Sequence, residues 1–480
     1  MAKIKLILPP HNYEGGSRAP EGISLGLGYI GKALMNEGHD VELLDIWLNQ
    51  LSKEQVIKEI KNFNCEAIGI NAFSTQYSYV KWLCEKIKEH TDIPILMGGA
   101  LPTFSMEIIL KNTMADVCVI GEGEITMAEL LKYPIEDVSG IWFKRKGKIF
   151  ANPPREQIKD LDQIDFPAWE LFDVEKYIQT NRMSGSDKRA MPIISGRGCP
   201  YNCRFCSKTL FRGFRFRSVS NIIKEIETVI ERYDINFIDF VDDLLIISTD
   251  RAFELCDAIE PLNVKWCCQG RSNIVILEIL KRMKKAGCVG IGYGVESGSQ
   301  KILDLMNKQI TVKQSKEAVI NTINLGMDAY VQIMYGYPGE TKETLEETVH
   351  FFDTIPYKRP VFLSATTPVP GSPLYNDCLK NGLIKDEVKY IESLEAGWLA
   401  NTEAAKKNRI NPTEFSDEDY WKFKEDAERR IFKSQVRRFP LHFLKQYIAK
   451  TIRYYQRRGI KKLIKRLYNA LKLIASGRPA

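Results

Sequence analysis

The sequence predicts an α/β protein in three parts: a doubly wound parallel sheet, a partial (β/α)6 barrel and a helical C-terminal region. Five short apolar segments alternate with amphipathic ones in the first part, and six more do so in the middle. The end of the chain instead shows helical periodicity with many Lys and Arg. We therefore expect a first domain, a connector, a second domain and a helical region at residues 1–135, 136–189, 190–383 and 384–480.

Small or turn-forming residues follow the strands of the first domain. The repeated strand and helix pattern predicts a parallel sheet, which binds ligands beyond the carboxyl ends of its strands. Small residues at those ends let a large flat ligand approach the backbone, so a sizeable cofactor is expected there. The expected strands are 3–8, 40–45, 67–71, 93–97 and 117–120, and the residues after them include Pro9, Ser74, Thr75, Gly98, Gly99, Gly121 and Glu122.

A glycine pattern in the first domain superficially matches a dinucleotide fingerprint. Residues 26–31 read GLGYIG, and Asp45 ends the next expected strand. The fingerprint must follow its strand directly, whereas seventeen residues separate Leu8 from Gly26. We therefore do not expect a nicotinamide or flavin site.

The connector has hairpin character at 140–150, followed by a Pro- and Asp-rich linker. The alternation after it favours an open, partial TIM-like barrel, in which chemistry takes place at the carboxyl ends of the strands. A cysteine run begins four residues after the first of these strands. The expected strands are 191–195, 237–241, 264–269, 289–293, 329–335 and 362–366.

The cysteine run reads CPYNCRFC and contains Cys199, Cys203 and Cys206. Three thiolates can bind three irons of a [4Fe-4S] cubane and leave the fourth iron open, where S-adenosylmethionine (SAM) is a suitable ligand. One electron from the cluster would then cleave SAM to a 5′-deoxyadenosyl radical. A zinc site needs a fourth Cys or His, and the five histidines are all remote in sequence. Cys65, Cys84, Cys118, Cys256, Cys288 and Cys378 stand alone and are expected to be small core residues.

Over about residues 190–380 the chain resembles the radical SAM superfamily. The resemblance rests on the cysteine run and on polar or glycine-rich segments after the later strands. It implies that Phe205 packs near the adenine of SAM and that Arg271 faces the SAM carboxylate. It also places Glu296 and Ser297 at the ribose, and Asp242 and Asp243 near the amino group, although relatives more commonly carry Gly-Gly-Glu there.

Residues 1–135 resemble the cobalamin-binding domain of cobalamin-dependent radical SAM enzymes, through segments 26–45, 97–103 and 121–126. The Asp-x-His-x-x-Gly loop that supplies a histidine to cobalt is absent, so cobalamin would bind without that ligand. An empty, degenerate domain is the alternative, because fold alone does not establish a ligand. The resemblance implies cobalamin contacts at Pro9, Ser74, Thr75, Gly98, Gly99, Thr103, Gly121 and Glu122.

The resemblance implies a radical SAM enzyme that uses a [4Fe-4S] cluster, SAM and cobalamin to functionalise an unactivated carbon, with methyl transfer favoured. It leaves individual catalytic residues unassigned. An electron donor such as flavodoxin or ferredoxin is the implied partner. Ring formation or oxidation without methyl transfer stays open, since the cofactors supply the chemistry. A methylthiotransferase would need a second cluster on Cys65, Cys84 and Cys118, and a non-enzymatic cobalamin or iron–sulfur sensor is a further alternative.

The C-terminal tail combines charge with an apolar stripe. Residues 433–480 contain fourteen Lys and Arg and no Asp or Glu, whereas the preceding chain is more acidic than basic. The stripe could lie on anionic lipid, bind nucleic acid or pack on the barrel. We favour the lipid surface, with a hydrophobic or lipid-like substrate, and expect no nucleic acid partner. With no signal-peptide pattern, we expect a cytoplasmic protein that is peripheral on the inner face of the membrane. The stripe contains Phe443, Leu444, Tyr447, Ile448, Ile464, Leu467 and Leu471.

Overall fold

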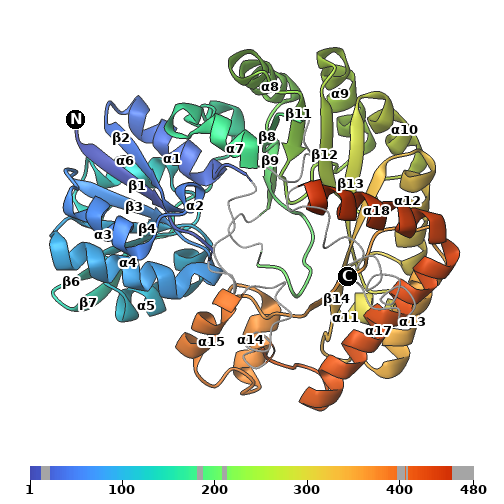
Figure 1. Ribbon diagram of the computed structural model, residues 1–480. Helices are drawn as coiled ribbons and strands as arrows, with labels where there is room; N and C mark the ends of the chain where they lie inside the picture. The colour runs from blue at the N-terminus through green and yellow to red at the C-terminus, as the bar shows by residue number, and fades with distance from the viewer. Residues whose placement is uncertain (12–21, 181–187, 208–212, 397–405, 407–408, 457–480) are drawn as a thin grey trace. The chain divides into compact units, whose positions relative to one another are not determined.

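The computed structural model describes residues 1–11, 22–180, 188–207, 213–396, 406 and 409–456 (Figure 1). The chain divides into two compact units. The first comprises Met1–Gln269 and Thr367–Ile410, and the second comprises Gly270–Thr366 and Asn411–Ala480. Among the described residues, no helix has the length and apolar character needed to cross a membrane.

The first unit contains a seven-stranded sheet in the order β2-β1-β3-β4-β5-β6-β7. Strands β1 to β5 are parallel, as the sequence predicts, and the expected hairpin extends this sheet as the antiparallel pair β6 and β7. The bounds are β1 Lys3–Leu8, β2 Asp40–Asp45, β3 Ala67–Asn71, β4 Ile95–Gly98, β5 Val117–Val119, β6 Ile141–Arg145 and β7 Lys148–Ala151.

Helices cover both faces of this sheet, which confirms the doubly wound arrangement (Figure 1). Helices α3 to α5 pack their apolar positions against β1, β3, β4 and β5 and form one continuous core. Helices α1 and α6 contact each other on the opposite face. The bounds are α1 Leu25–Asn36, α2 Ile46–Asn49, α3 Lys53–Lys61, α4 Tyr77–His90, α5 Ala100–Asn112, α6 Glu124–Leu130 and α7 Val174–Thr180.

The glycines of the dinucleotide-like pattern have a packing role in α1. A Cβ on Gly28 would lie 2.7 Å from the Cβ of Pro167, and one on Gly31 would lie 2.3 Å from a methyl group of Leu171. The connector thus crosses α1 closely where these glycines lie, and the Ala168 amide donates to the Gly28 carbonyl at 3.0 Å. These glycines therefore allow the backbones of α1 and the connector to pack closely together.

Gly28→Ala is therefore expected to destabilise the first unit by about 1–3 kcal/mol, because the added methyl meets a rigid proline ring. Gly26→Ala is the matched control on the same helix, since a Cβ there has no neighbour within 4 Å. Urea unfolding checks this as a lower midpoint for Gly28→Ala at an unchanged slope. Equal midpoints for the two variants would contradict the packing role.

A second, six-stranded sheet has the order β15-β14-β13-β12-β11-β8. Pairings are parallel among β8, β11 and β12 in the first unit and among β13, β14 and β15 in the second, which confirms the second predicted set of strands. The bounds are β8 Ala190–Ile193, β11 Phe237–Phe240, β12 Lys265–Gly270, β13 Cys288–Glu296, β14 Asp328–Tyr335 and β15 Leu363–Ala365. The helices are α8 Val219–Tyr233, α9 Thr249–Ile259, α10 Leu277–Lys285, α11 Gln300–Leu305, α12 Val312–Asn324, α13 Lys342–Asp353, α14 Pro373–Lys380 and α15 Glu387–Ser393.

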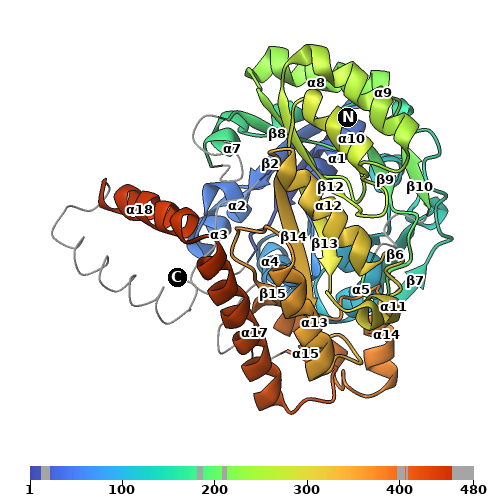
Figure 2. The same ribbon diagram turned by 90° about the vertical axis from the view of Figure 1, so that its right-hand side faces the viewer.

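Two long helices follow in the second unit, α17 (Asp417–Arg438) and α18 (Pro440–Gln456). Helix α17 runs alongside α13 (Figure 2). Its Tyr420 ring lies against Tyr335 at a centroid distance of 4.8 Å. A Cβ on Gly336 would meet the hydroxyl and ring of Tyr420 at 2.2–2.5 Å. Gly336 has φ +76°, so both space and backbone conformation require glycine there.

Candidate functional site

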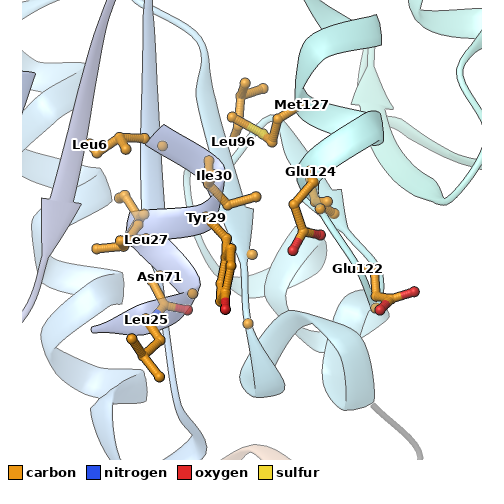
Figure 3. A pocket seen from close by; sticks show the side chains of 18 of the residues that line it. Leu6, Leu25, Leu27, Tyr29, Ile30, Asn71, Leu96, Glu122, Glu124 and Met127 are labelled. Atoms are coloured by element: carbon orange, nitrogen blue, oxygen red, sulfur yellow. The ribbon is translucent and has the colours of Figure 1, made fainter. Parts of the chain in front are cut away.

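A pocket of about 270 Å³ opens at the carboxyl edge of the first sheet (Figure 3). Its walls come from the ends of β1, β3, β4 and β5, from the first turns of α1, and from α6. Most of the lining is apolar, and two carboxylates lie at one side. The lining side chains labelled in Figure 3 are Leu6, Leu25, Leu27, Tyr29, Ile30, Asn71, Leu96, Glu122, Glu124 and Met127.

Glycines keep the strand ends open. Gly98 and Gly99 line the pocket, as does Gly121. Gly99 has φ +98°, and a Cβ there would lie 2.4 Å from the Asn71 side-chain oxygen. Behind them, the Thr103 hydroxyl donates to the Gly99 carbonyl at 2.7 Å and accepts from the Gly121 amide at 3.1 Å. Thr103 therefore fixes the two glycine turns and does not line this pocket.

Besides Thr103, three more of the residues expected at the cofactor lie outside the pocket lining. Pro9 follows β1, and its carbonyl accepts a 2.7 Å hydrogen bond from the Gln76 side chain. Ser74 is buried in the turn after β3, and the Thr75 hydroxyl lies 2.9 Å from Nδ1 of His11. Burial lowers the pKa of His11 to about 4, so this imidazole is neutral near pH 7.

The structure adds pocket residues that the sequence analysis missed, chiefly Leu25, Leu27, Tyr29 and Ile30 of α1. Apolar residues at helical spacing predict a buried face without indicating whether protein or ligand covers it. Arg197 is also part of the lining and was missed, because it lies far along the chain.

Arg197 links this pocket to the cysteine run. It belongs to β9 (Gly196–Gly198), which pairs antiparallel with β10 (Phe214–Phe216), a small sheet that was not expected from sequence. Its guanidinium lies 2.7 Å from Glu122, 2.5 Å from Glu124 and 5.2 Å from the Tyr29 ring centroid. Burial alone would lower the pKa of Arg197, but the two glutamates outweigh it and raise the pKa. Arg197 is therefore a charged, paired residue.

The cysteines lie directly after β9. Cys199 is half-buried, Cys203 is buried and Cys206 is exposed, and none forms a disulfide. The Cys206 amide donates to the Cys203 carbonyl at 3.2 Å, which makes a turn between these two. Phe205 is half-buried in this turn. Within the described ranges, no three His, Cys, Asp or Glu side chains gather as they would around one metal ion. Ligands of a cubane bind different irons, so they need not converge on one point.

Helix α14 anchors the same loop. The Leu374 amide donates to the Arg204 carbonyl at 2.9 Å, and the Arg204 guanidinium lies 2.5 Å from Asp377. Arg204 lies between two of the cysteines, so the middle of the run is held by a neighbouring helix as well as by β9.

Asp242 follows β11, the strand that pairs with β8 in front of the cysteine run. Its Oδ1 accepts from the amide and hydroxyl of Ser195, both at 2.8 Å. Its Oδ2 is buried with no hydrogen-bond partner among the described residues, and burial raises the pKa of Asp242 to about 6. Asp243 is exposed. The structure thus brings Asp242, but not Asp243, to a buried position with an acceptor to spare.

In the second unit, Arg271 follows β12 and is buried. Glu296 ends β13 with φ +63°, a conformation that is costly for a residue with a side chain. Its carboxylate pairs with Lys308 at 2.7 Å, a partner that the sequence analysis did not identify. The Ser297 hydroxyl lies 3.2 Å from that of Thr348 and accepts from the Ser299 amide at 3.1 Å.

The lone cysteines of the first domain lie in its core. Cys84 and Cys118 are fully buried in the core of the sheet, and Cys65 is half-buried beside it. Burial raises the pKa of Cys84 to about 12 and also raises that of Cys118. A raised thiol pKa disfavours the thiolate that binds iron, so these two have the properties of core residues.

Two protein-family models match the chain. The radical SAM superfamily model covers residues 193–352, and the B12 binding domain model covers residues 15–131. These ranges contain the cysteine run and most of the pocket.

Curated relatives and solved structures agree with both matches. An uncharacterised methyltransferase of Pyrococcus horikoshii is 32% identical, over 80% of this chain and 84% of the relative. An anaerobic magnesium-protoporphyrin IX monomethyl ester cyclase of Rubrivivax gelatinosus is 30% identical, over 72% of this chain and 64% of the relative. The structure of the radical SAM methyltransferase TsrM of Kitasatospora setae was solved with cobalamin and a [4Fe-4S] cluster. It is 16% identical with a TM-score of 0.65, over 79% of this chain and 75% of TsrM. The chain therefore belongs to the radical SAM enzymes that carry a B12-binding domain.

Proposed function

We propose that the chain is a cobalamin-dependent radical SAM methyltransferase. The observation that carries the proposal is Arg197, which lines the pocket of the B12-binding domain and lies two residues before the first cysteine of the cluster motif. One structural element thus belongs to both predicted cofactor sites. The methyltransferase relative from Pyrococcus horikoshii supports the reaction class.

The pocket fits part of a cobalamin. Its 270 Å³ is below the usual range for a whole drug-sized ligand, and cobalamin is larger still. A planar aromatic base such as the one on the nucleotide tail of cobalamin suits its apolar walls. The corrin would then cover the strand ends at Gly98, Gly99 and Gly121, where no side chain stands in the way. His11 is half-buried against Trp47 and Phe73, and we assign it no bond to cobalt.

The SAM site also has a fitting group. The buried Oδ2 of Asp242 has an open acceptor position, which the ammonium group of SAM would fill. We propose that Phe205, Asp243, Arg271, Glu296 and Ser297 complete this site as the resemblance implies. When bound, the cluster on Cys199, Cys203 and Cys206 would supply the electron that cleaves SAM, and cobalamin would supply the methyl group. The protein residues bind and orient these groups.

SAM affinity is expected to depend on the ionisation of Asp242. Burial raises its pKa to about 6, so the carboxylate that attracts an ammonium is present above pH 6 and is lost below it. The SAM dissociation constant should therefore rise by up to about tenfold per pH unit below 6. Asp242→Asn should bind SAM weakly at every pH and remove this dependence. Equilibrium dialysis with labelled SAM measures both proteins, and a wild-type profile that stays flat between pH 5 and 7 would contradict the role.

The experiment for the reaction class is product analysis. Reconstituted protein with a reductant, SAM and cobalamin should give 5′-deoxyadenosine from the radical reaction and S-adenosylhomocysteine from methyl donation. A cyclase without methyl transfer would give the first product alone, and the cyclase relative from Rubrivivax gelatinosus makes this the second candidate function. Flavodoxin or ferredoxin is our proposed electron donor. Absence of S-adenosylhomocysteine with every electron donor would contradict the methyltransferase assignment.

We also propose that the C-terminal helices bring a cytoplasmic enzyme to an anionic membrane, where a hydrophobic substrate would be taken up. In α18, Leu441, Leu444 and Ile448 share one helical face and are exposed, although Phe443, expected in the same stripe, is buried against Phe432. The predicted stripe residues Ile464, Leu467 and Leu471 lie outside the described part of the chain.

The full chain is expected to float with anionic vesicles, less so at high salt, and not with neutral ones. A variant that ends at Phe439 should lose this binding. It retains Gln435 and Arg438, whose side chains bond to backbone carbonyls of residues 352–359 and so secure α17. Leu444→Ser with Ile448→Ser should weaken binding at unchanged charge. Equal flotation of the full and shortened chains would contradict the proposal.

A further inference from the structure

The base of the cysteine loop carries two arginines that face each other. Arg197 of β9 and Arg215 of β10 are directly opposite in the antiparallel ladder. Like charges at such positions destabilise a ladder unless another group neutralises them. Because this ladder closes the loop that begins with Cys199, whatever neutralises the arginines also holds the loop.

The neutralising groups come from the B12-binding domain. Glu122 lies 2.7 Å from Arg197 and 3.0 Å from Arg215, and Glu124 lies 2.5 Å from Arg197. Two positive and two negative charges are thus gathered in one buried cluster, with side-chain exposure of 4% at Glu122 and 7% at Arg197. We call these four residues the arginine clamp. A buried cluster of this kind depends on every member, because removing one leaves an opposite charge uncompensated.

Further bonds fix the geometry of the clamp. The second oxygen of Glu122 accepts from the Ile158 amide at 2.9 Å, and Arg215 donates to the Ile158 carbonyl. Burial alone would raise the pKa of Glu122, but Arg215 and Arg197 outweigh it and lower the pKa. Glu122 is therefore ionised near neutral pH, and the backbone of the connector at Ile158 holds it in place.

The clamp is also part of the pocket wall. Arg197, Glu122 and Glu124 all line the pocket, as does Tyr29, over which the Arg197 guanidinium lies. A ligand in the pocket would contact the same side chains that hold the ladder below the cysteines. A ligand that orders these side chains at the pocket lowers the entropic cost of ordering them at the cysteine loop, and the reverse also holds.

We propose that the arginine clamp consists of positioning residues that couple the two cofactor sites, so that an assembled cluster tightens cobalamin binding and bound cobalamin stabilises the cluster loop. This inference rests on the proposed function. Coupling is reciprocal, so it can be measured from the cobalamin side alone, without turnover.

The experiment compares hydroxocobalamin affinity before and after anaerobic cluster assembly, by absorbance titration of each protein. The quantity compared is the ratio of the hydroxocobalamin dissociation constant without the cluster to that with it. In the wild type this ratio should be at least about five, a typical size for coupling between sites. In Glu122→Gln the ratio should fall below about twofold, and Glu122→Asp should restore part of it.

Glu225→Gln is the matched control. Glu225 is a buried glutamate that pairs with Arg217, the residue directly after β10. Glu225 does not line the pocket. It should retain the wild-type ratio even where it lowers the melting temperature. If Glu122→Gln fails to fold, Arg215→Lys replaces it, since lysine keeps the charge but not the geometry of the guanidinium.

The outcomes separate the inference from the proposed function. A wild-type ratio near one, with cobalamin bound in both states, would overturn the coupling and leave the proposed function intact. A wild-type ratio retained in Glu122→Gln and Arg215→Lys would also overturn it, since the clamp would then be merely structural. A wild-type chain that binds no cobalamin would overturn the proposed function itself.

Discussion

Replacing Cys199, Cys203 and Cys206 together by Ala is expected to abolish cluster assembly and SAM cleavage, with the protein still folded. The three residues are the only source of thiolates on the loop after β9, and Cys206 is exposed, so no core packing depends on it. Without thiolates the irons have no ligands, and the reductive step has no electron source. Iron content, the visible absorbance of the cluster and 5′-deoxyadenosine formation measure the effect.

Ala at Cys65, Cys84 and Cys118 is the matched triple control. It removes the same number of sulfurs, and the buried positions should cost stability of about 1 kcal/mol each. The control should retain about four irons per chain. If the wild type held more than about four irons per chain and this control lost the excess, the result would favour a methylthiotransferase with a second cluster. Retention of a cluster by the first triple variant would refute the assignment of its ligands.

Gly98→Leu is expected to weaken cobalamin binding by at least about a hundredfold, because the new side chain would occupy the pocket without disturbing the core. A Cβ on Gly98 meets no heavy atom closer than 4.0 Å, to Val119, and Gly98 has no positive φ. The added side chain is therefore expected to extend into the pocket of the B12-binding domain. Absorbance of bound corrin after gel filtration measures the loss.

Gly22→Leu is the control for this substitution. Gly22 is exposed and does not line the pocket, and a Cβ on it would have no neighbour within 4 Å. This variant should bind cobalamin as the wild type does. Full binding by Gly98→Leu would show that cobalamin lies elsewhere, and the strand-end glycines would lose their assigned role.

The fold was largely predictable because its signals are local. Apolar runs between turns indicated each strand of both sheets, with starts shifted by about two residues at β4, where Pro94 precedes the first paired residue. Strand position in turn placed the cysteine run and Asp242 after β8 and β11. The short ladder of β9 and β10 was missed, since three residues such as Gly196–Gly198 carry no alternation that predicts a strand.

The site was only partly predictable because its remaining parts depend on contacts between distant segments. Glu122 looked like one residue of a strand-end turn, and nothing near it in sequence indicated Arg197, 75 positions away. Pro9 and Thr75 were placed at the cofactor from strand ends alone, and local pattern gave no sign of their contacts with Gln76 and His11. Local pattern thus finds the edge of the sheet, while tertiary packing decides which side chains form the pocket.

The most direct test of the central claim is to measure iron and corrin in one sample of anaerobically reconstituted protein after gel filtration. Two cofactor sites in one chain predict about four irons and about one cobalamin per chain. Loss of corrin in Gly98→Leu with iron retained, and loss of iron in the Cys199, Cys203 and Cys206 variant, would assign each cofactor to its site. A wild-type sample with iron but no corrin would contradict the account.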